Sequence, residues 1–587
     1  MEQETQKQLE KELNISSAAA RMLVVRGIQT ADEARAFVRP SLDKLHDPFL
    51  MRDMDKAVER LHHAITQNEK ILIYGDYDVD GTTAVALMYR FLEAMRREGD
   101  EAKGAEIDYY IPDRYSEGYG VSQRGIDYAA AQGCGLIITL DCGIKAVEKI
   151  AYANSKGIDV IVCDHHTPGD ELPQAVAVLN MKRNDCPYPY KDLSGCGVGF
   201  KLAQAYTQRY GLSFEHLIPL LQLLAMSIAS DIVPITGENR ILAHYGIKQL
   251  NTQPFTGLSA IMQVAGIEAK KITINELVYK IGPRINACGR MKSGRAAVEL
   301  LLTDDPAFAR QQAEEVNHHN EDRRDCDTET TKEALQQLQD DPNFAQRHST
   351  VVYAPHWHKG VVGIVASRLT ETYYRPTIVL TAGEDGIISG SARSVGGFDI
   401  YAAIDSCHDL LTNFGGHKYA AGLSMHINDL PEFKQRFEAY VATHIQPNQL
   451  QPTLDIEAEI TLGDITSHFR SVLRHLEPFG PGNPRPLFVS RRLINHRDTR
   501  IVGKRGVKDS KDSTPRPLHL RLDVTDGTIN QDGTVNAITG IAFGRADMAE
   551  YIQNGNAVDI CYELNENTFN HYTTIQMMVQ DIRAIKN

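Results

Sequence analysis

The sequence predicts an α/β protein with a separate C-terminal β-barrel, and three observations lead to this fold class. Between residues 66 and 240, short apolar runs typical of strands alternate with helical segments, which is the pattern of a parallel sheet covered on both faces. A smaller alternation of the same kind recurs over residues 349–448. Over residues 449–587, short β-like runs with turn signals favour a barrel of the oligonucleotide-binding (OB) type.

Length, composition and charge limit what the protein can be. A chain of 587 residues should hold about four domains at roughly 150 residues each. Nine cysteines without a C-x-x-C pair argue against a disulfide framework and against a thiolate zinc site. The N-terminus is polar, and no apolar run approaches the roughly 18 residues that span a bilayer, so we expect a cytoplasmic protein without membrane contact. With a net charge of -14, any nucleic-acid binding must depend on local basic patches.

Residues 1–65 are expected to form a helical lead-in without chemical function. The segment 30–33 is a capping box that opens a short helix ending before Pro40. Residues 54–65 have helical spacing of apolar positions.

The next region, residues 66–240, carries the predicted parallel sheet. Its strand-like runs are residues 70–75, 107–111, 136–140, 159–163 and 175–179. Helical segments between them include residues 82–97, 122–132 and 145–156. Ligands of such sheets bind beyond the carboxyl ends of the strands, so the chemistry is expected there.

Acidic and imidazole side chains follow these strand ends. The first strand is followed by three aspartates at alternate positions, which an extended segment would turn to one side. Each could be a solvated loop or helix-end residue, but together they concentrate more charge than folding tolerates without a cation. The set comprises Asp76, Asp78 and Asp80, then Asp141, then Asp164, His165 and His166, and finally Asp231 at the end of an apolar helix.

These donors suit two divalent cations, and Asp141 could bridge them. Oxygen ligands mixed with an imidazole favour Mn²⁺ over Mg²⁺, with Mg²⁺ as a substitute. A pair of such ions activates water and neutralises charge on a phosphoryl group. Phosphoester hydrolysis is therefore the leading reaction class.

The same residues resemble a known family. The segments around Asp76, Asp141, Asp164 and Asp231 are similar, in that order, to the four motifs of the DHH phosphoesterases. Residues 414–422 resemble the G-G-H-x-x-A-A-G signature of the DHH-associated domain, and residues 282–291 resemble a segment typical of the RecJ branch. The motifs cover about residues 50–425. Small-substrate members carry a histidine where this chain has Leu72, and this departure fits the RecJ branch.

The resemblance implies roles for the site residues. The ligands would be Asp76, Asp78, Asp141, His165 and Asp231, while His166 would contact the scissile phosphate or the leaving oxygen, and Asp80 and Asp164 would orient their neighbours. Which histidine takes which role stays open. The resemblance also implies a single-strand-specific 5′→3′ DNA exonuclease that releases 5′-mononucleotides in recombination and repair. Its implied partners are single-stranded DNA, a single-strand-binding protein and a recombination helicase, and the chain is expected to be a monomer.

Four further segments are candidates for holding the substrate, and two of them precede the second α/β region. Arg114 and Tyr119, in the loop 111–120, offer a phosphate fork and a stacking face, and by resemblance they meet the 5′ end of the strand. Arg284 and Arg290 are expected in a glycine-containing loop that follows the helices after residue 236. A packed surface loop is the alternative at residues 111–120.

Residues 241–348 are predicted to be helical, and the polar stretch 305–341 is expected to form one long helix joining two domains.

In the second α/β region, residues 350–354 and 377–381 are expected to be strands, with a helix over 363–373 between them. A small-residue loop over 389–394 would bring Ser391 and Arg393 to a phosphate. The glycine-rich segment 414–422 would bring His417 and Lys418 to it as well. Glycine-rich turns without function are the alternative.

The C-terminal region is expected to bind nucleic acid. Its strand candidates are residues 453–460, 487–493, 518–524, 536–543 and 557–564. Between residues 485 and 521 there are eleven Lys or Arg and three acids, and this sign of charge suits a nucleic-acid backbone.

Two other functions compete with the exonuclease. The first is a DHH phosphodiesterase acting on short oligonucleotides or small phosphate substrates, which turnover of a dinucleotide against a long strand would distinguish. The second is a DNA-binding scaffold with an inactive site, which would bind no metal after dialysis against Mn²⁺.

Overall fold

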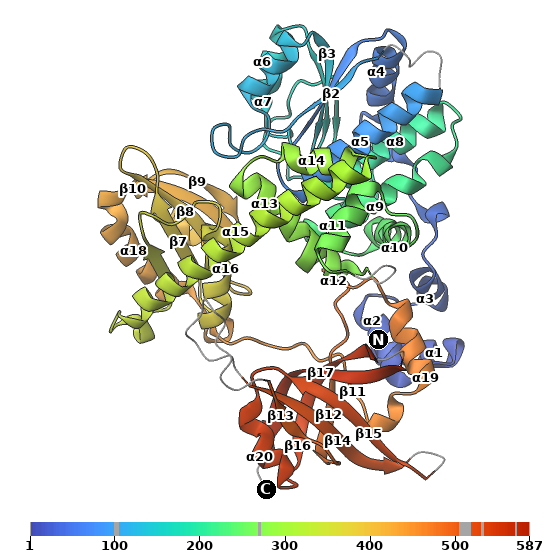
Figure 1. The fold of residues 1–587 in the computed structure, drawn as a ribbon, viewed down its shortest axis with the longest axis vertical. Coiled ribbons are helices and arrows are strands. Elements are labelled where there is room, and N and C mark those ends of the chain that lie inside the picture. Colours follow the sequence, from blue (N-terminus) through green and yellow to red (C-terminus); the bar gives the residue numbers. More distant parts are fainter. Residues whose placement is uncertain are drawn as a thin grey trace. The chain divides into compact units, whose positions relative to one another are not determined.

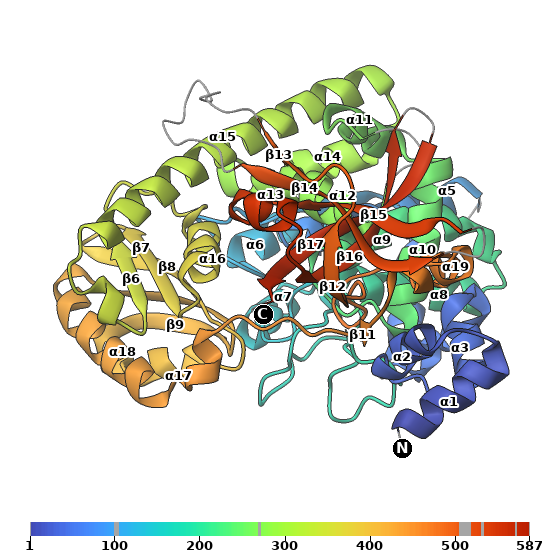
Figure 2. The ribbon, with the colours of Figure 1, turned by 90° about the horizontal axis from the view of Figure 1, so that it is seen from below.

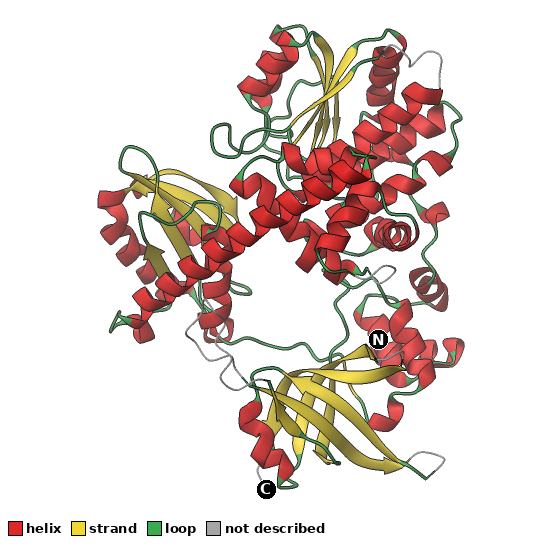
Figure 3. Ribbon diagram, in the orientation of Figure 1, coloured by secondary structure: helices red, strands yellow, loops and turns green. Residues whose placement is uncertain are grey.

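The fold comes from a computed structural model. It describes residues 2–98, 105–267, 272–503, 518–529, 533–569 and 572–585. The chain divides into two compact units, which we call the sheet unit (Asp47–Asp231 and Tyr245–Thr453) and the barrel unit (Met1–His46, Ile232–His244 and Leu454–Asn587). Figure 3 distinguishes the helices and strands of each. Among the described residues, no helix is long and apolar enough to cross a membrane.

The sheet unit begins with a five-stranded parallel sheet of order β2-β1-β3-β4-β5. Its strands are β1 (Lys70–Gly75), β2 (Ile107–Tyr110), β3 (Cys134–Leu140), β4 (Asp159–Cys163) and β5 (Ala177–Leu179). The pairs Gly75↔Leu140 and Leu140↔Cys163 make the carboxyl ends of β1, β3 and β4 level with one another. The predicted parallel sheet is confirmed.

Helices cover both faces of this sheet. On one face, α6 (Gln123–Ala131) and α7 (Val147–Ser155) bury apolar side chains against the strands. The other helices of this region are α4 (Met54–Thr66), α5 (Val79–Glu98), α8 (Gly195–Arg209) and α9 (Leu221–Ser230). Among them, α5 packs against α8 and α9 (Figure 1).

A helical region follows and ends in one long helix. It contains α10 (Gly237–Thr252), α11 (Thr256–Val264), α12 (Ile274–Glu276), α13 (Gly282–Met291), α14 (Arg295–Leu302) and α15 (Pro306–Gln339). Figure 1 shows α15 running from α11 and α14 to α16 (Val362–Tyr373), as the polar stretch predicted. The predicted loop around Arg284 and Arg290 is wrong: these residues lie in α13, where Pro283 stands in the first turn and the apolar side chains between them are buried.

The second sheet has the order β6-β7-β8-β10-β9, with β6 and β7 parallel and the other pairs antiparallel. The strands are β6 (Thr350–Tyr353), β7 (Thr377–Ala382), β8 (Ile387–Arg393), β9 (Leu411–His417) and β10 (Ala420–His426). One face packs on α17 (Ile400–Asp405) and α18 (Leu430–His444), and the other on α16 (Val362–Tyr373), as Figure 2 shows. The small-residue loop predicted at 389–394 is therefore wrong, because this segment is strand β8 up to Arg393, with Ile388 and Ala392 buried.

The barrel unit contains a seven-stranded sheet of order β11-β12-β16-β17-β15-β14-β13, and an additional β12–β14 pairing closes it toward a barrel. The strands are β11 (Ala458–Glu459), β12 (Phe488–Asn495), β13 (Arg500–Val502), β14 (His519–Ile529), β15 (Val535–Ala542), β16 (Val558–Phe569) and β17 (Tyr572–Ala584). The sequence missed β13 and β17. The helices of this unit are α1 (Glu2–Leu13), α2 (Ser17–Val25), α3 (Ala31–Val38), α19 (Ser467–His475) and α20 (Ala549–Gln553).

The predicted basic excess between residues 485 and 521 is only partly visible, since residues 504–517 lie outside the described residues. Among the described arginines of this stretch, Arg491 pairs with Glu459 and Asp559. Arg521 lies 2.7 Å from Asp498. Neighbouring acids thus offset part of the local positive charge.

Candidate metal centre

Three strand ends bring acidic side chains to one edge of the parallel sheet. Asp76, Asp141 and Asp164 are the first residues after β1, β3 and β4. Asp231 follows α9 and caps it, because its backbone N–H donates to Ser227 O at 2.9 Å. The expected extended run over residues 76–80 is wrong, since α5 begins at Val79 and Asp80 lies in its first turn. Asp76 and Asp80 reach the site because the chain turns between the end of β1 and the start of α5.

Asp141 has a constrained backbone. Its φ is +61°, a left-handed conformation that non-glycine residues adopt rarely. The N-terminus of α8 lies directly against it, because a Cβ on Gly195 would be 2.5 Å from Asp141 Cβ and 2.7 Å from its Oδ1. Such strain persists only where the surrounding structure fixes it, and it is common at active sites.

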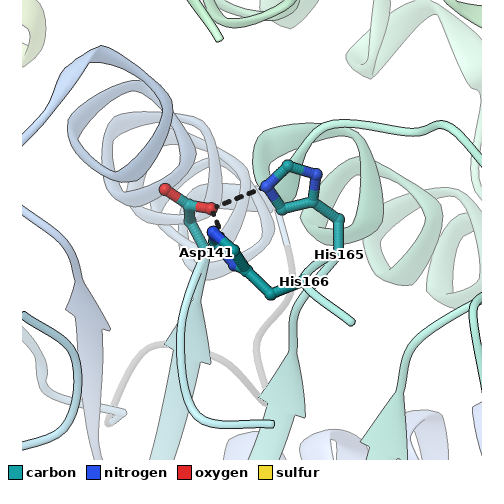
Figure 4. Close-up of side chains that lie close together, drawn as sticks. All are labelled: Asp141, His165 and His166. Atoms are coloured by element: carbon teal, nitrogen blue, oxygen red, sulfur yellow. Dashed lines mark ion pairs between the residues drawn. The ribbon is translucent and has the colours of Figure 1, made fainter. Parts of the chain in front are cut away.

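The imidazole of His165 lies among three carboxylates. Its Nε2 is 3.2 Å from Asp141 Oδ1, 3.5 Å from Asp231 Oδ2 and 3.8 Å from Asp80 Oδ2. His166 Nδ1 is 3.9 Å from Asp141 Oδ1, and Figure 4 shows both imidazoles directed at this carboxylate. Two sets of donors are close enough to hold an ion, namely Asp141, His165 and His166, and Asp80, His165 and Asp231.

Several buried polar atoms at this edge have no hydrogen-bond partner among the described residues. They are Asp76 Oδ1, Asp141 Oδ1, Asp231 Oδ2 and both ring nitrogens of His165. Buried polar groups in folded proteins are almost always paired, so such a cluster needs a ligand. Oxygen and imidazole donors are those that Mn²⁺ accepts, and the residues present therefore fit the predicted metal.

The electrostatics of the cluster also favour a cation. Burial, and then the charges of Asp80, Asp78 and Asp231, raise the pKa of Asp141 well above its usual value. Burial and the neighbouring carboxylates raise the pKa of Asp231 to about 9. Burial lowers the pKa of His165, which keeps the imidazole neutral, as a metal ligand must be. A divalent ion would reverse the repulsion among the carboxylates.

Two carboxylates hold the surrounding elements in place. Asp80 accepts from the backbone N–H of Gly195 at 2.7 Å, from that of Cys196 at 2.8 Å and from Ser227 Oγ at 2.7 Å, so it ties α5 to α8 and α9. Asp164 contacts His166 Nδ1 at 2.8 Å. Burial alone would raise the pKa of Asp164, but the hydrogen bond and charge of His166 lower it.

A pocket of about 470 Å³ lies beside this cluster and reaches the second sheet. Of the predicted substrate-binding residues, it is lined by Arg114, Tyr119, Arg290, Ser391 and Arg393. Tyr119 connects it with the cluster, since its hydroxyl donates to Asp141 O at 2.9 Å and lies 3.2 Å from His166 Nδ1.

Three predicted substrate contacts do not line this pocket: Arg284, His417 and Lys418. Arg284 instead donates to Asn317 Oδ1 at 2.9 Å. Sequence reasoning missed other residues that do line it, among them Tyr77, Lys359 and Ser389. The alternation of a strand over residues 387–393 could have revealed Ser389, because it shares a face with Ser391.

Comparisons with known proteins agree with this arrangement. Three domain models match in order: the N-terminal domain of the DHH family over residues 70–228, the DHHA1 domain over 348–443 and the RecJ OB domain over 456–581. The single-stranded-DNA-specific exonuclease RecJ of Bacillus subtilis (strain 168) is 33% identical over 581 residues, covering 99% of this chain and 70% of that relative. The enzyme of the same name from Escherichia coli (strain K12) is 33% identical over 586 residues, covering 96% of this chain and 95% of that relative.

Solved structures give the same result. The crystal structure of RecJ in complex with Mn²⁺ from Thermus thermophilus matches with a TM-score of 0.80 and 27% identity, covering 99% of this chain and 78% of that one. The same protein in complex with Mg²⁺ matches with a TM-score of 0.75 and 26% identity, covering 99% of this chain and 77% of that one. These relatives match nearly the whole sequence. The chain belongs to the RecJ family, a branch of the DHH family.

Proposed function

We propose that this chain is a metal-dependent exonuclease that hydrolyses single-stranded DNA from the 5′ end to 5′-mononucleotides in recombination and DNA repair. One observation carries this proposal: buried carboxylate and imidazole atoms without partners among the described residues converge beside a pocket lined by three arginines. The family relatives named as single-stranded-DNA-specific exonucleases support the choice of substrate.

The chain's own residues have distinct tasks in this proposal. Asp76, Asp78, Asp141, His165 and Asp231 would hold Mn²⁺, or Mg²⁺ in its place, and such ions neutralise a phosphate and activate water. His166, oriented by Asp164, would contact the scissile phosphate or the departing 3′ oxygen. Asp80 would fix the helices behind the ligands, although its carboxylate also lies within reach of an ion.

The far end of the pocket would bind the 5′ end of the strand. Arg114 lies 4.9 Å above the ring of Tyr77, and Arg393 donates to Ser391 Oγ at 2.8 Å, so both guanidiniums have defined positions. Burial, and then the charges of Arg114, Arg323 and Arg393, lower the pKa of Arg290 to about 10. A phosphate placed among these cations would relieve their repulsion. Cleavage then adds water to phosphorus, and the 3′ oxygen leaves with a proton.

The test compares 5′-phosphorylated single strands with duplexes in the presence of Mn²⁺. We expect the single strand to be degraded, and Asp141→Ala to abolish cleavage while preserving DNA binding. Asp170→Ala, which changes an exposed acid of the same unit, is the matched control. Strands labelled at either end, in DNA and RNA versions, give direction and sugar preference. A protein that leaves the single strand intact and cuts the duplex would refute the proposal.

We also propose that the chain acts as a monomer in the cytoplasm, together with a single-strand-binding protein and a recombination helicase. The family membership supports these partners. Light scattering would give the mass in solution, and co-purification with each partner would test the contacts. A stable dimer would contradict the monomer.

A further inference from the structure

The floor of the pocket is one face of the second sheet, and its residues lie in two rows across β8, β10 and β9. Ser391 pairs with Gly422, which pairs with Gly415, and we call these three the inner row. Ser389 pairs with Ser424, which pairs with Asn413, and we call these the outer row. The rows are two residues, or about 7 Å, apart along the strands. All six residues line the pocket.

The inner row belongs to the 5′-phosphate site of the proposed function. Arg393 donates to Ser391 Oγ, and α16 begins beside them. A Cβ on Gly363, in the first turn of α16, would lie 3.1 Å from Arg393 Nη2 and 3.2 Å from Ser391 Oγ. A single phosphate bound here would leave the outer row without a contact.

The outer row offers a donor that the protein does not use. Ser389 is 8% exposed, and its hydroxyl has no hydrogen-bond partner among the described residues. A buried hydroxyl without a partner is unfavourable, and a ligand in the pocket would satisfy it. Asn413 and Ser424 add an amide and a second hydroxyl beside it.

The charge of the pocket exceeds that of one phosphate. Arg114, Arg290, Arg393 and Lys359 line it, and none of the described lining residues is Asp or Glu. A terminal monophosphate carries at most about two negative charges at neutral pH. The positive charge that one phosphate leaves uncompensated, together with the outer row, therefore suits a ligand with more than one phosphate.

We propose that the pocket accepts strands that carry a 5′-triphosphate, with the outer phosphates bound by Ser389, Ser424 and Asn413. This rests on the proposed function, because the inner row holds the phosphate next to the sugar. Water adds to the phosphorus of the first internucleotide linkage, and the 3′ oxygen of the first nucleotide leaves with the proton. The products are a nucleoside 5′-triphosphate and a strand that is one nucleotide shorter, with a 5′-monophosphate. The bonds between the three phosphates stay intact.

The test uses two single strands of one sequence, with a 5′-monophosphate or a 5′-triphosphate. The parent protein is expected to degrade both and to release a nucleoside triphosphate first from the second, as ion-exchange chromatography would show. Ser389→Ala should lower kcat/KM about tenfold for the triphosphate strand, as for a hydrogen bond to a charged group, and leave the monophosphate strand unaffected. Ser424→Glu should also lower kcat/KM for the triphosphate strand and not for the monophosphate strand, because the new carboxylate would repel the outer phosphates. Ser406→Ala, whose hydroxyl donates to Ala403 O outside the pocket, should change neither value.

Folding does not limit the test, because Ser389→Ala removes a hydroxyl that has no partner among the described residues. Cleavage of the monophosphate strand without cleavage of the triphosphate strand would overturn the inference and leave the proposed function standing. Equal losses on both strands in Ser389→Ala would also overturn it. If free dATP competes with the monophosphate strand while the triphosphate strand stays intact, the pocket binds a nucleotide and not this substrate. Failure on both strands would refute the proposed function itself.

Discussion

Replacement of Gly195 by alanine tests whether Asp141 must be held where the structure places it. The new Cβ would lie 2.5 Å from Asp141 Cβ, 2.7 Å from its Cα and 2.7 Å from its Oδ1. Ordinary carbon contacts begin near about 3.5 Å, so the two segments must separate by roughly 1 Å. A displacement of this size at a reacting centre can lower the rate about 100-fold. We therefore expect kcat for strand degradation to fall by about two orders of magnitude.

Stability should change much less than activity. Overpacking costs about 1–3 kcal/mol, and Gly195 is the first residue of α8, where alanine gains less over glycine than the roughly 1 kcal/mol of a helix interior. The matched control is Gly197→Ala in the same helix, where the nearest atoms to the new Cβ are Leu193 Cβ at 3.3 Å and Ser194 Oγ at 3.4 Å. Mononucleotide release with Mn²⁺ and thermal unfolding would be measured for both variants. Activity of Gly195→Ala within threefold of the parent would refute the reasoning.

Three further changes test other parts of the structure. Tyr119→Phe removes the hydroxyl that contacts His166 and the backbone after β3, so kcat should fall about tenfold, as for one hydrogen bond, with KM for the strand unchanged. Arg240 donates to four backbone carbonyls of the barrel unit, and Arg240→Ala should lower its free energy of unfolding by about 3 kcal/mol in urea, because buried acceptors lose their donors. The hydrogen bond from Arg436 lowers the pKa of Asp409 to about 2. The pair therefore stabilises the fold above the ordinary pKa of 3.8 and loses this effect as the pH falls through about 2. Asp409→Asn should melt below the parent at pH 6, and the difference should shrink toward pH 2; an equal difference at both values would exclude this pair as its source.

The sequence could place residues of the candidate metal centre together because one geometric rule governs their positions. In a parallel sheet the carboxyl ends of neighbouring strands meet at one edge, so residues far apart in the chain can be placed together from strand ends alone. Asp76, Asp141 and Asp164 follow this rule. The register of β1, β3 and β4 confirms it. The ligand roles themselves stay predictions that the variants above test.

Strand β8 and helix α13 were harder to predict because runs of small residues are typical of loops. In β8 and α13 the glycines and serines lie within regular elements, where close packing of neighbouring backbone requires small side chains. A Cβ on Gly390 would lie 2.0 Å from Val379 O, and one on Gly289 would lie 2.6 Å from Tyr77 O. The contact of Gly289 joins segments distant in sequence, so no local pattern reveals it. The same holds for the contact between Tyr119 and His166.

Several contacts fix the position of Asp141 independently of a bound ion. Its backbone is left-handed, its N–H donates to Cys163 O at 2.9 Å, and its carbonyl accepts from the Tyr119 hydroxyl at 2.9 Å. The N-terminus of α8 contacts the other side of the residue at Gly195, and Asp80 holds that terminus through two backbone N–H groups. A carboxylate surrounded by like charges would otherwise turn toward solvent, since burial and its neighbours favour its neutral form. The restraints keep the carboxylate directed at His165, so the binding free energy of a cation is not reduced by the ordering of its ligands.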